Sequence, residues 1–315
     1  MSPTPNHGYN TPSQGAQDWD VPVNENFADF DVDIEIRDSG TPGSNNYDPQ
    51  DGAKYLDTDS GLVYEGDGSG WTRVFMLPRF DSGTGNIVLG ETSNTTGTSG
   101  ANIVTGGADN SADGPHAAVG GGSNNEASGQ GSVAPGGRDN VASGVDSVVG
   151  GGVGNDSTNN GSTVAGGKFG TASGTNSTVA GGAQNEANAN NATVGGGFNN
   201  LAAAEYATIA GGAPADFDNQ DTTRNVVHDN YGTIGGGGNN QAGTQGSDTT
   251  DAPYATVAGG DGNDATGEKS TISGGVDNLA DSIFASVGGG STNHATAEST
   301  TVGGGDGNEA NTMRS

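Results

Sequence analysis

The sequence predicts an all-β protein, in which a small N-terminal β module precedes a parallel β-roll made of 15-residue repeats. The main evidence is a (Ser/Thr)-Val-x-Gly-Gly phrase that recurs at a fixed spacing beyond residue 80, because a fixed period of this kind is the signature of a solenoid. The 61 glycines and the many β-branched residues also oppose helix. Each repeat has room for two short strands and two tight turns.

Each phrase contains one apolar residue, here called the anchor, on which the repeats can be aligned. Alignment from a first anchor at Leu89 gives 14 repeats, and 11 of the 13 intervals are 15 residues long. Asparagine predominates six residues after the anchor and alanine eight residues after it. We expect the asparagines to stack as a ladder along the rod, and the anchors to form its core. The predicted core anchors are Val104, Val119, Val149, Val164, Val179, Val194, Ile209, Ile234, Val257, Ile272, Val287 and Val302.

The predicted core is thin, because each coil buries little more than one valine or isoleucine and one alanine. Such a core is too small for independent stability, but small residues let neighbouring backbones approach closely. We therefore expect a homotrimer in which three rolls pack side by side about an axis. Coils that pair in parallel at about 4.8 Å make a rod of roughly 65–70 Å.

The composition is strongly acidic, with 38 acids against 9 lysines and arginines and a formal net charge of −29. Acidic, lysine-poor surfaces resemble those of proteins from extreme halophiles, since molar salt shortens the screening length to about 3 Å. No basic face is available for nucleic acid. The sequence has no cysteine and no apolar run long enough to span a bilayer, so we expect neither nucleic acid nor membrane as a partner.

The first 80 residues have a different chemistry from the repeats. We expect residues 1–20 to be an extended arm and residues 21–80 to be a β attachment module, followed by the repeat domain at 81–315. Apolar and charged residues alternate in "FDVDIEIRD" at 30–38, which is the pattern of a half-buried strand. The glycines of Gly66–Gly70 predict a turn between two further strands.

The repeats resemble the head domain of trimeric autotransporter adhesins, the YadA-like heads, over residues 84–310. In the two "STVAGG" phrases, Val164 and Val179 match the family's first core position, whereas Gly166 and Gly181 stand where the family usually has isoleucine. The resemblance implies a left-handed parallel β-roll trimer, here with a thinner core. The sequence shows no sign of that family's stalk, membrane anchor or signal peptide, so we do not expect an autotransporter.

A second resemblance covers residues 18–77. The runs "NENFADFDVDIEIRD" and "DGAKYLDTDSGLVYEGDGSGWTRV" are similar to N-terminal segments of fibre-like proteins of phages, notably of haloarchaeal viruses. This resemblance implies a virion protein that is anchored through its N-terminus.

Two insertions interrupt the period, at about residues 213–230 and 243–253, and insertions in a solenoid are where binding surfaces usually lie. Three tyrosines lie three residues before consecutive anchors, and we expect them to form a column beside both insertions, as a platform for a sugar or a protein loop. The alternative is that these rings only cap the thin core. The receptor-binding candidates are Tyr206, Tyr231, Tyr254, Asp216, Asp218, Asp221, His228, Asp248 and Asp251, with Arg224 and Asp229 in the first insertion.

Metal and catalytic sites have little support in the sequence. "GGVGND" at 151–156 and "GGDGND" at 259–264 match the start of calcium-binding nonapeptide repeats, but neither recurs nine residues later, as that motif requires. We expect no cofactor, and at most weak binding of divalent cations by carboxylates of the inserted loops. Abundant aspartates make a carboxylate pair uninformative about glycosidase chemistry.

These observations favour a virion structural protein, namely a trimeric fibre or spike, rather than an enzyme. In this interpretation, residues 1–80 bind a virion anchoring protein, the roll is exposed on the particle, and it attaches to a surface glycoprotein or glycan of a halophilic archaeon. Three alternatives stay open: a capsid decoration or turret protein without a receptor role, a carbohydrate-active tailspike enzyme, and a cellular adhesin.

Overall fold

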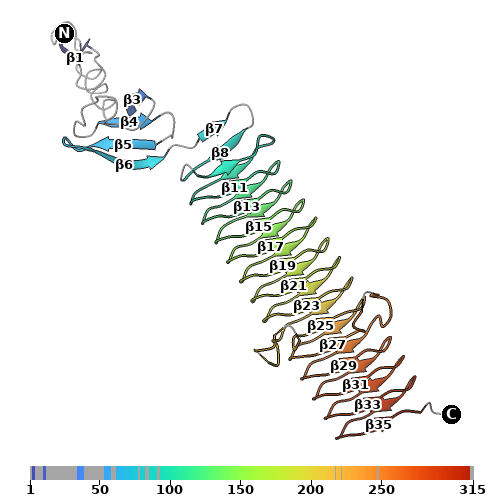
Figure 1. Cartoon of the computed structure of the whole chain (residues 1–315). Helices are drawn as coiled ribbons and strands as arrows, with labels where there is room; N and C mark the ends of the chain where they lie inside the picture. Colours follow the sequence, from blue (N-terminus) through green and yellow to red (C-terminus); the bar gives the residue numbers. More distant parts are fainter. Residues whose placement is uncertain are drawn as a thin grey trace, which may run out of the picture.

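The computed structural model shows a long rod with a small sheet at its N-terminal end (Figure 1). The part of the chain that it describes contains strands and turns but no helix, so the predicted all-β class is confirmed. The rod is a parallel β-solenoid. The described residues are 2–3, 10–11, 34–38, 53–57, 62–76, 79–81, 85–90, 93–216, 218–220, 222–246 and 248–312.

The N-terminal part contains a short antiparallel pair, β1 (Ser2–Pro3) and β2 (Asn10–Thr11), and a four-stranded sheet. In this sheet β3 pairs with β4 in parallel, and β4, β5 and β6 are antiparallel. The predicted turn is confirmed, because Asp67 caps it by accepting hydrogen bonds from the backbone amides of Ser69 and Gly70. The four strands are β3 (Ile34–Asp38), β4 (Lys54–Asp57), β5 (Leu62–Gly66) and β6 (Trp71–Met76).

Each coil of the roll contributes one strand to each of two sheets. The sheet that carries the anchors, here the anchor sheet, has 15 strands, of which β7 is antiparallel and spans the expected domain boundary. Its strands are β7 (Arg79–Asp81), β8 (Asn86–Val88), β10 (Ile103–Val104), β12 (Ala118–Val119), β14 (Val133–Ala134), β16 (Val148–Val149), β18 (Thr163–Val164), β20 (Thr178–Val179), β22 (Thr193–Val194), β24 (Thr208–Ile209), β26 (Thr233–Ile234), β28 (Thr256–Val257), β30 (Thr271–Ile272), β32 (Ser286–Val287) and β34 (Thr301–Val302).

The second sheet, here the alanine sheet, has 14 parallel strands. A first turn leads from each anchor strand to the alanine strand of the same coil, and a second turn leads on to the next anchor strand. Its strands are β9 (Thr95–Thr96), β11 (Ser111–Ala112), β13 (Glu126–Ala127), β15 (Val141–Ala142), β17 (Asp156–Ser157), β19 (Thr171–Ala172), β21 (Glu186–Ala187), β23 (Leu201–Ala202), β25 (Val226–Val227), β27 (Gln241–Ala242), β29 (Asp264–Ala265), β31 (Leu279–Ala280), β33 (His294–Ala295) and β35 (Glu309–Ala310).

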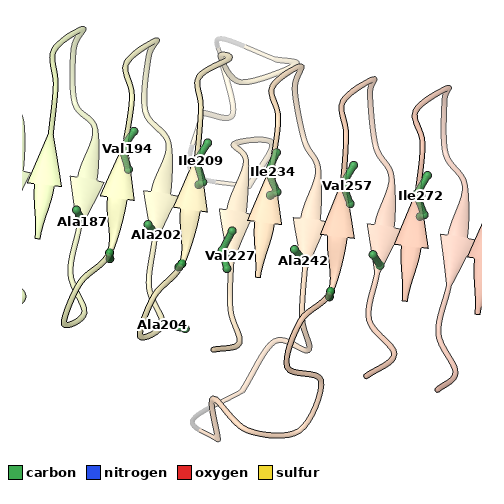
Figure 2. Close-up of a cluster of buried hydrophobic side chains, with 14 of the residues drawn as sticks. Ala187, Val194, Ala202, Ala204, Ile209, Val227, Ile234, Ala242, Val257 and Ile272 are labelled. Carbon is green, nitrogen blue, oxygen red and sulfur yellow. The ribbon is translucent and has the colours of Figure 1, made fainter. Parts of the chain in front are cut away.

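The predicted core is confirmed: all twelve predicted anchors are buried, and Val302 at the end of the rod is the most exposed of them at 7%. Figure 2 shows several anchors alternating along the rod with the buried residues of the other sheet, which are mostly alanines. The first repeat is a correction. Val88, not Leu89, pairs with Val104, so the first coil has 16 residues rather than 15. This coil lacks the Gly-Gly pair that marks the phase elsewhere.

The predicted asparagine ladder is also present and is buried. The amide nitrogen of Asn140 donates to the carbonyl oxygens of Gly136 and Gly152, and its oxygen accepts from the backbone amide of Asn155. The Gly-Gly pair beside it is required by space as well as by conformation. Gly152 has a φ of +92°, and a Cβ there would collide with the carbonyl oxygen of Gly167 in the next coil.

Candidate binding surface on the inserted coils

The two insertions lie on opposite edges of the roll. Compared with a regular coil, residues 214–223 are added to the first turn after Ile209, and residues 244–251 are added to the second turn of the next coil. Figure 2 shows the two long loops at opposite ends of the strands. The sequence correctly predicts insertions in consecutive coils. The expectation that both lie beside the tyrosine column is wrong, because the tyrosines lie only in second turns.

The insertions meet a groove on the outward face of the alanine sheet. Its floor comes from β23, β25 and β27, and the first insertion supplies Thr222 while the second supplies Gln245. The groove has a volume of about 410 Å³, and the residues that line it are Leu201, Thr222, Arg224, Val226, His228, Gln241 and Gln245. The two loops therefore act on one surface even though they leave the roll at different edges.

Arg224 is the cationic residue of this groove. Its side chain is 17% exposed, and its Nη1 lies 3.4 Å from Glu186 Oε1 and 3.3 Å from Asn199 Oδ1. Its Nε is buried and has no hydrogen-bond partner among the described residues. No carboxylate appears among the described residues that line the groove, although the chain has 38 acids. On the outward face of the alanine sheet the groove is thus a local exception to the acidic rows, with Glu186 at its edge as the partner of Arg224.

His228 lies beside Arg224 and is half-buried. Burial lowers the pKa of its imidazole, and the positive charge of Arg224 lowers it further, whereas the charge of Asp229 and a hydrogen bond with Gln241 oppose the shift. At neutral pH this histidine is therefore uncharged, and its ring offers one donor and one acceptor. Together with the two glutamine amides, it gives the groove polar groups of both kinds.

Asp229 joins the two ends of the second insertion through hydrogen bonds. It is fully buried, and its Oδ2 accepts hydrogen bonds from the backbone amides of Thr244 at 2.7 Å and Ala252 at 3.2 Å, the two ends of the loop. Regular coils have mostly glycine or alanine at this turn position. A Cβ at Gly129, for example, would collide with the carbonyl oxygen of Gly144. Asn159 occupies the same position in a regular coil, so a side chain of this size fits without an insertion. The second insertion supplies the two backbone amides that Asp229 binds.

The three candidate tyrosines form the expected column. The ring centroids of Tyr206 and Tyr231 are 4.9 Å apart, those of Tyr231 and Tyr254 are 4.7 Å apart, and the rings are nearly parallel. Lys269 and Phe284 occupy the same turn position in the next two coils, and the Lys269 ammonium lies 5.1 Å from the Phe284 ring centre. The faces that stack on one another are closed to a sugar ring. The rings are 44–50% exposed, so their edges and hydroxyls are what the column offers.

The acidic candidates do not converge on one point. Asp216 lies on the first-insertion edge of the roll, where hydrogen bonds from Asn219 and Asp218 lower the pKa of its carboxyl. On the other edge, hydrogen bonds from Thr250 lower the pKa of Asp248, whose negative charge raises the pKa of Asp251.

Asp218 is exposed on the first loop, and Asp221 lies outside the described residues. Within the described ranges, no three His, Asp or Glu side chains gather in a way that could hold a metal ion.

Of the receptor-binding candidates predicted from the sequence, His228 is the one that lines the groove. Sequence reasoning noted Arg224 but did not single it out, and it missed the apolar floor. A signal was available, because Leu201 and Val226 occupy outward positions of the alanine sheet where neighbouring coils have Glu186 and Gln241. Two apolar residues in adjacent coils on an outward row interrupt a polar pattern, and they do so next to the first insertion.

Comparison with known proteins gives no relative on which to base a function. The chain matches no protein-family model and no curated protein. A search of the described residues for a helix long and apolar enough to cross a membrane finds none.

Proposed function

We propose that this protein is a fibre that attaches a virus particle to the surface of a halophilic archaeal cell, with the inserted coils as its receptor-binding region. The observation that supports it best is the groove, which both insertions border on an otherwise uniform rod. Insertions that a solenoid does not need for its core are where such proteins carry binding surfaces. The resemblance of residues 18–77 to virus fibre proteins supports anchoring through the N-terminal module.

We also propose that the fibre is a homotrimer that packs through the outward face of its anchor sheet. The rows on this face begin with Ile87 and Leu89 and run to Thr301 and Gly303, and in the described strands they contain only uncharged residues. The corresponding rows of the alanine sheet contain Glu126, Asp156, Glu186 and other charges. Copies of a chain with a net charge of −29 meet at the lowest electrostatic cost on a face without carboxylates.

The attachment proposal is tested with fluorescently labelled protein and haloarchaeal cells in molar salt. One variant lacks residues 214–223 and carries Arg224→Asn, which leaves the Gly-Gly-Ala-Asn-Asn pattern of a regular first turn. A matched control lacks one regular coil, residues 162–176, which shortens the rod but keeps the inserted coils. We expect saturable binding by the natural chain and by the control, and loss of binding by the variant. Equal binding by all three proteins would contradict the proposal.

The trimer is tested by light scattering in molar salt, which we expect to give three times the chain mass. Thr178→Glu on the anchor sheet should reduce this mass, whereas Thr171→Glu on the alanine sheet should leave it unchanged. A monomer in molar salt, or equal effects of the two substitutions, would contradict packing through the anchor sheet. On transfer to low salt we expect the trimer to weaken, because repulsion among its charges is no longer screened.

A further inference from the structure

We infer that the groove between the insertions binds one sugar unit that carries a carboxylate, a uronic acid in chemical class. This deepens the attachment proposal, and the biological use of the groove rests on it, although the binding itself can be measured without any cell. The inference depends on three features: the apolar floor, the mixed polar rim and the position of Arg224.

The floor of the groove suits one face of a pyranose ring. Leu201 and Val226 lie next to each other in adjacent strands, at paired positions of the parallel sheet. Parallel neighbours are about 4.8 Å apart, so the two side chains make a small flat apolar patch. The C–H face of a sugar ring can cover such a patch. The volume of about 410 Å³ lies near the lower end of the range of about 300–1,000 Å³ for small-molecule sites.

The rim of the groove suits the hydroxyl groups of a sugar. Gln241 and Gln245 each have an amide that donates and accepts, Thr222 has a hydroxyl, and neutral His228 has one donor and one acceptor. Hydroxyl groups need partners of both kinds, because each one donates and accepts. Thr222 and Gln245 come from the two loops, so a shortened loop removes one side of the rim.

The charge of the groove selects a carboxylate. Arg224 lines the groove, and its ion pair with Glu186 is long at 3.4 Å, so its guanidinium can still bind a second carboxylate. A guanidinium presents paired donors that match the two oxygens of a carboxylate. The outward rows of the alanine sheet elsewhere carry Glu126, Asp156 and other acids that repel an anionic sugar, whereas the described lining of the groove has a cation and no carboxylate.

The test is titration of the whole protein in molar salt with methyl glucuronide, followed by NMR of the sugar and by calorimetry. Methyl glucoside, which lacks the carboxylate, is the matched ligand. We expect the glucuronide to bind about tenfold more tightly, the usual effect of one charge-assisted hydrogen-bonded pair. Arg224→Gln should bring the two affinities within about twofold of each other.

The floor is tested by Leu201→Glu, which should abolish binding of both sugars. Leu279→Glu is the matched control, because Leu279 occupies the same outward row, also beside an acidic neighbour, but away from the insertions. It should leave both affinities unchanged, and circular dichroism should show both variants folded. Failure of both sugars to bind the natural chain would overturn the inference, as would equal affinities for the two sugars or equal effects of the two substitutions.

The outcomes separate the two proposals. Binding to cells without binding to the glucuronide would leave attachment standing and overturn the groove as its sugar site. Binding to the glucuronide without binding to cells would leave the groove standing and contradict attachment. In a competition experiment, free glucuronide should reduce adsorption to cells if both proposals are correct.

Discussion

The regular coils and the inserted coils solve the same packing problem under different constraints. In the regular coils at 101–212, each turn touches the same turn of the next coil, so small residues are required where backbones meet. In the inserted coils the glycine turns still touch, since a Cβ at Gly212 would collide with the carbonyl oxygen of Gly237, but the second added loop also brings two backbone amides that Asp229 binds. The two regions therefore share one limit on side-chain size at the glycine turns, and they differ in the polar groups that the inserted loops add.

The largest expected effect is loss of one rung of the asparagine ladder in a regular coil. Asn140→Ala removes donors to Asn125 Oδ1 and to the carbonyl oxygens of Gly136 and Gly152, and an acceptor for Asn155. Each buried group left without a partner costs about 1–3 kcal/mol, so we expect at least about 3 kcal/mol of destabilisation. Thermal unfolding and hydrogen exchange of the adjacent amides measure it. A change below about 1 kcal/mol would show that water replaces the rung.

A smaller effect is expected in the inserted coils from Asp229→Ala. This substitution leaves the backbone amides of Thr244 and Ala252 without their acceptor, at a cost of about 2 kcal/mol. Faster hydrogen exchange should be confined to residues 244–251 and their neighbours. Exchange that increases equally in distant coils would mean that the loop and the regular coils unfold as one cooperative unit.

A stabilising change is expected where the ladder is interrupted. Gly170 stands where other coils have asparagine, and Asn155 Oδ1 accepts from its backbone amide. Gly170→Asn adds the missing amide, and its Cβ would meet its nearest neighbours at 3.2–3.4 Å. We expect about 1 kcal/mol of stabilisation from the restored hydrogen bonds and the lower entropy of the unfolded chain. Destabilisation would mean that Val164 and Val179 have closed the space.

The pH dependence of stability should show the titration of Asp264, which lies in the first regular coil after the insertions. Burial and then the charge of Asp277 raise the pKa of its carboxyl to about 6. A raised pKa means that the folded chain binds this proton more tightly than the unfolded chain, so stability falls as pH rises from about 4 to about 6. After discounting for solvent screening we expect at most about 1 kcal/mol. Asp264→Asn should flatten the melting temperature over this range, and an unchanged profile would contradict the assignment.

The smallest expected effect is that of Tyr231→Asn in the tyrosine column. Stacking with its two neighbours contributes about 0.5–1.5 kcal/mol per pair. Tyr231 also has a φ of +62°, a left-handed conformation that asparagine tolerates better than tyrosine. Because these contributions oppose each other, we expect a net loss below about 1 kcal/mol in thermal unfolding. A much larger loss would make the column a structural support of the inserted coils.

The roll follows from the sequence alone, because a period kept over more than 200 residues leaves few other ways to bury one valine and one alanine per coil. The sequence also determined the twelve core anchors, the asparagine ladder and the tyrosine column, since each follows from equal positions in stacked coils. The sequence did not predict the anchor of the first coil correctly. The anchor is Val88 rather than Leu89, and the Gly-Gly pair that marks the other anchors is missing there.

The position of each inserted loop on the roll becomes clear only from the folded chain. The anchor spacing shows that the two insertions add 10 and 8 residues. It does not show that one insertion lies in a first turn and the other in a second turn. Only the stacked coils bring Thr222 and Gln245 to the same groove over Leu201 and Val226. The physical reason is that a period specifies what repeats along the rod, whereas the groove depends on contacts between segments that do not repeat.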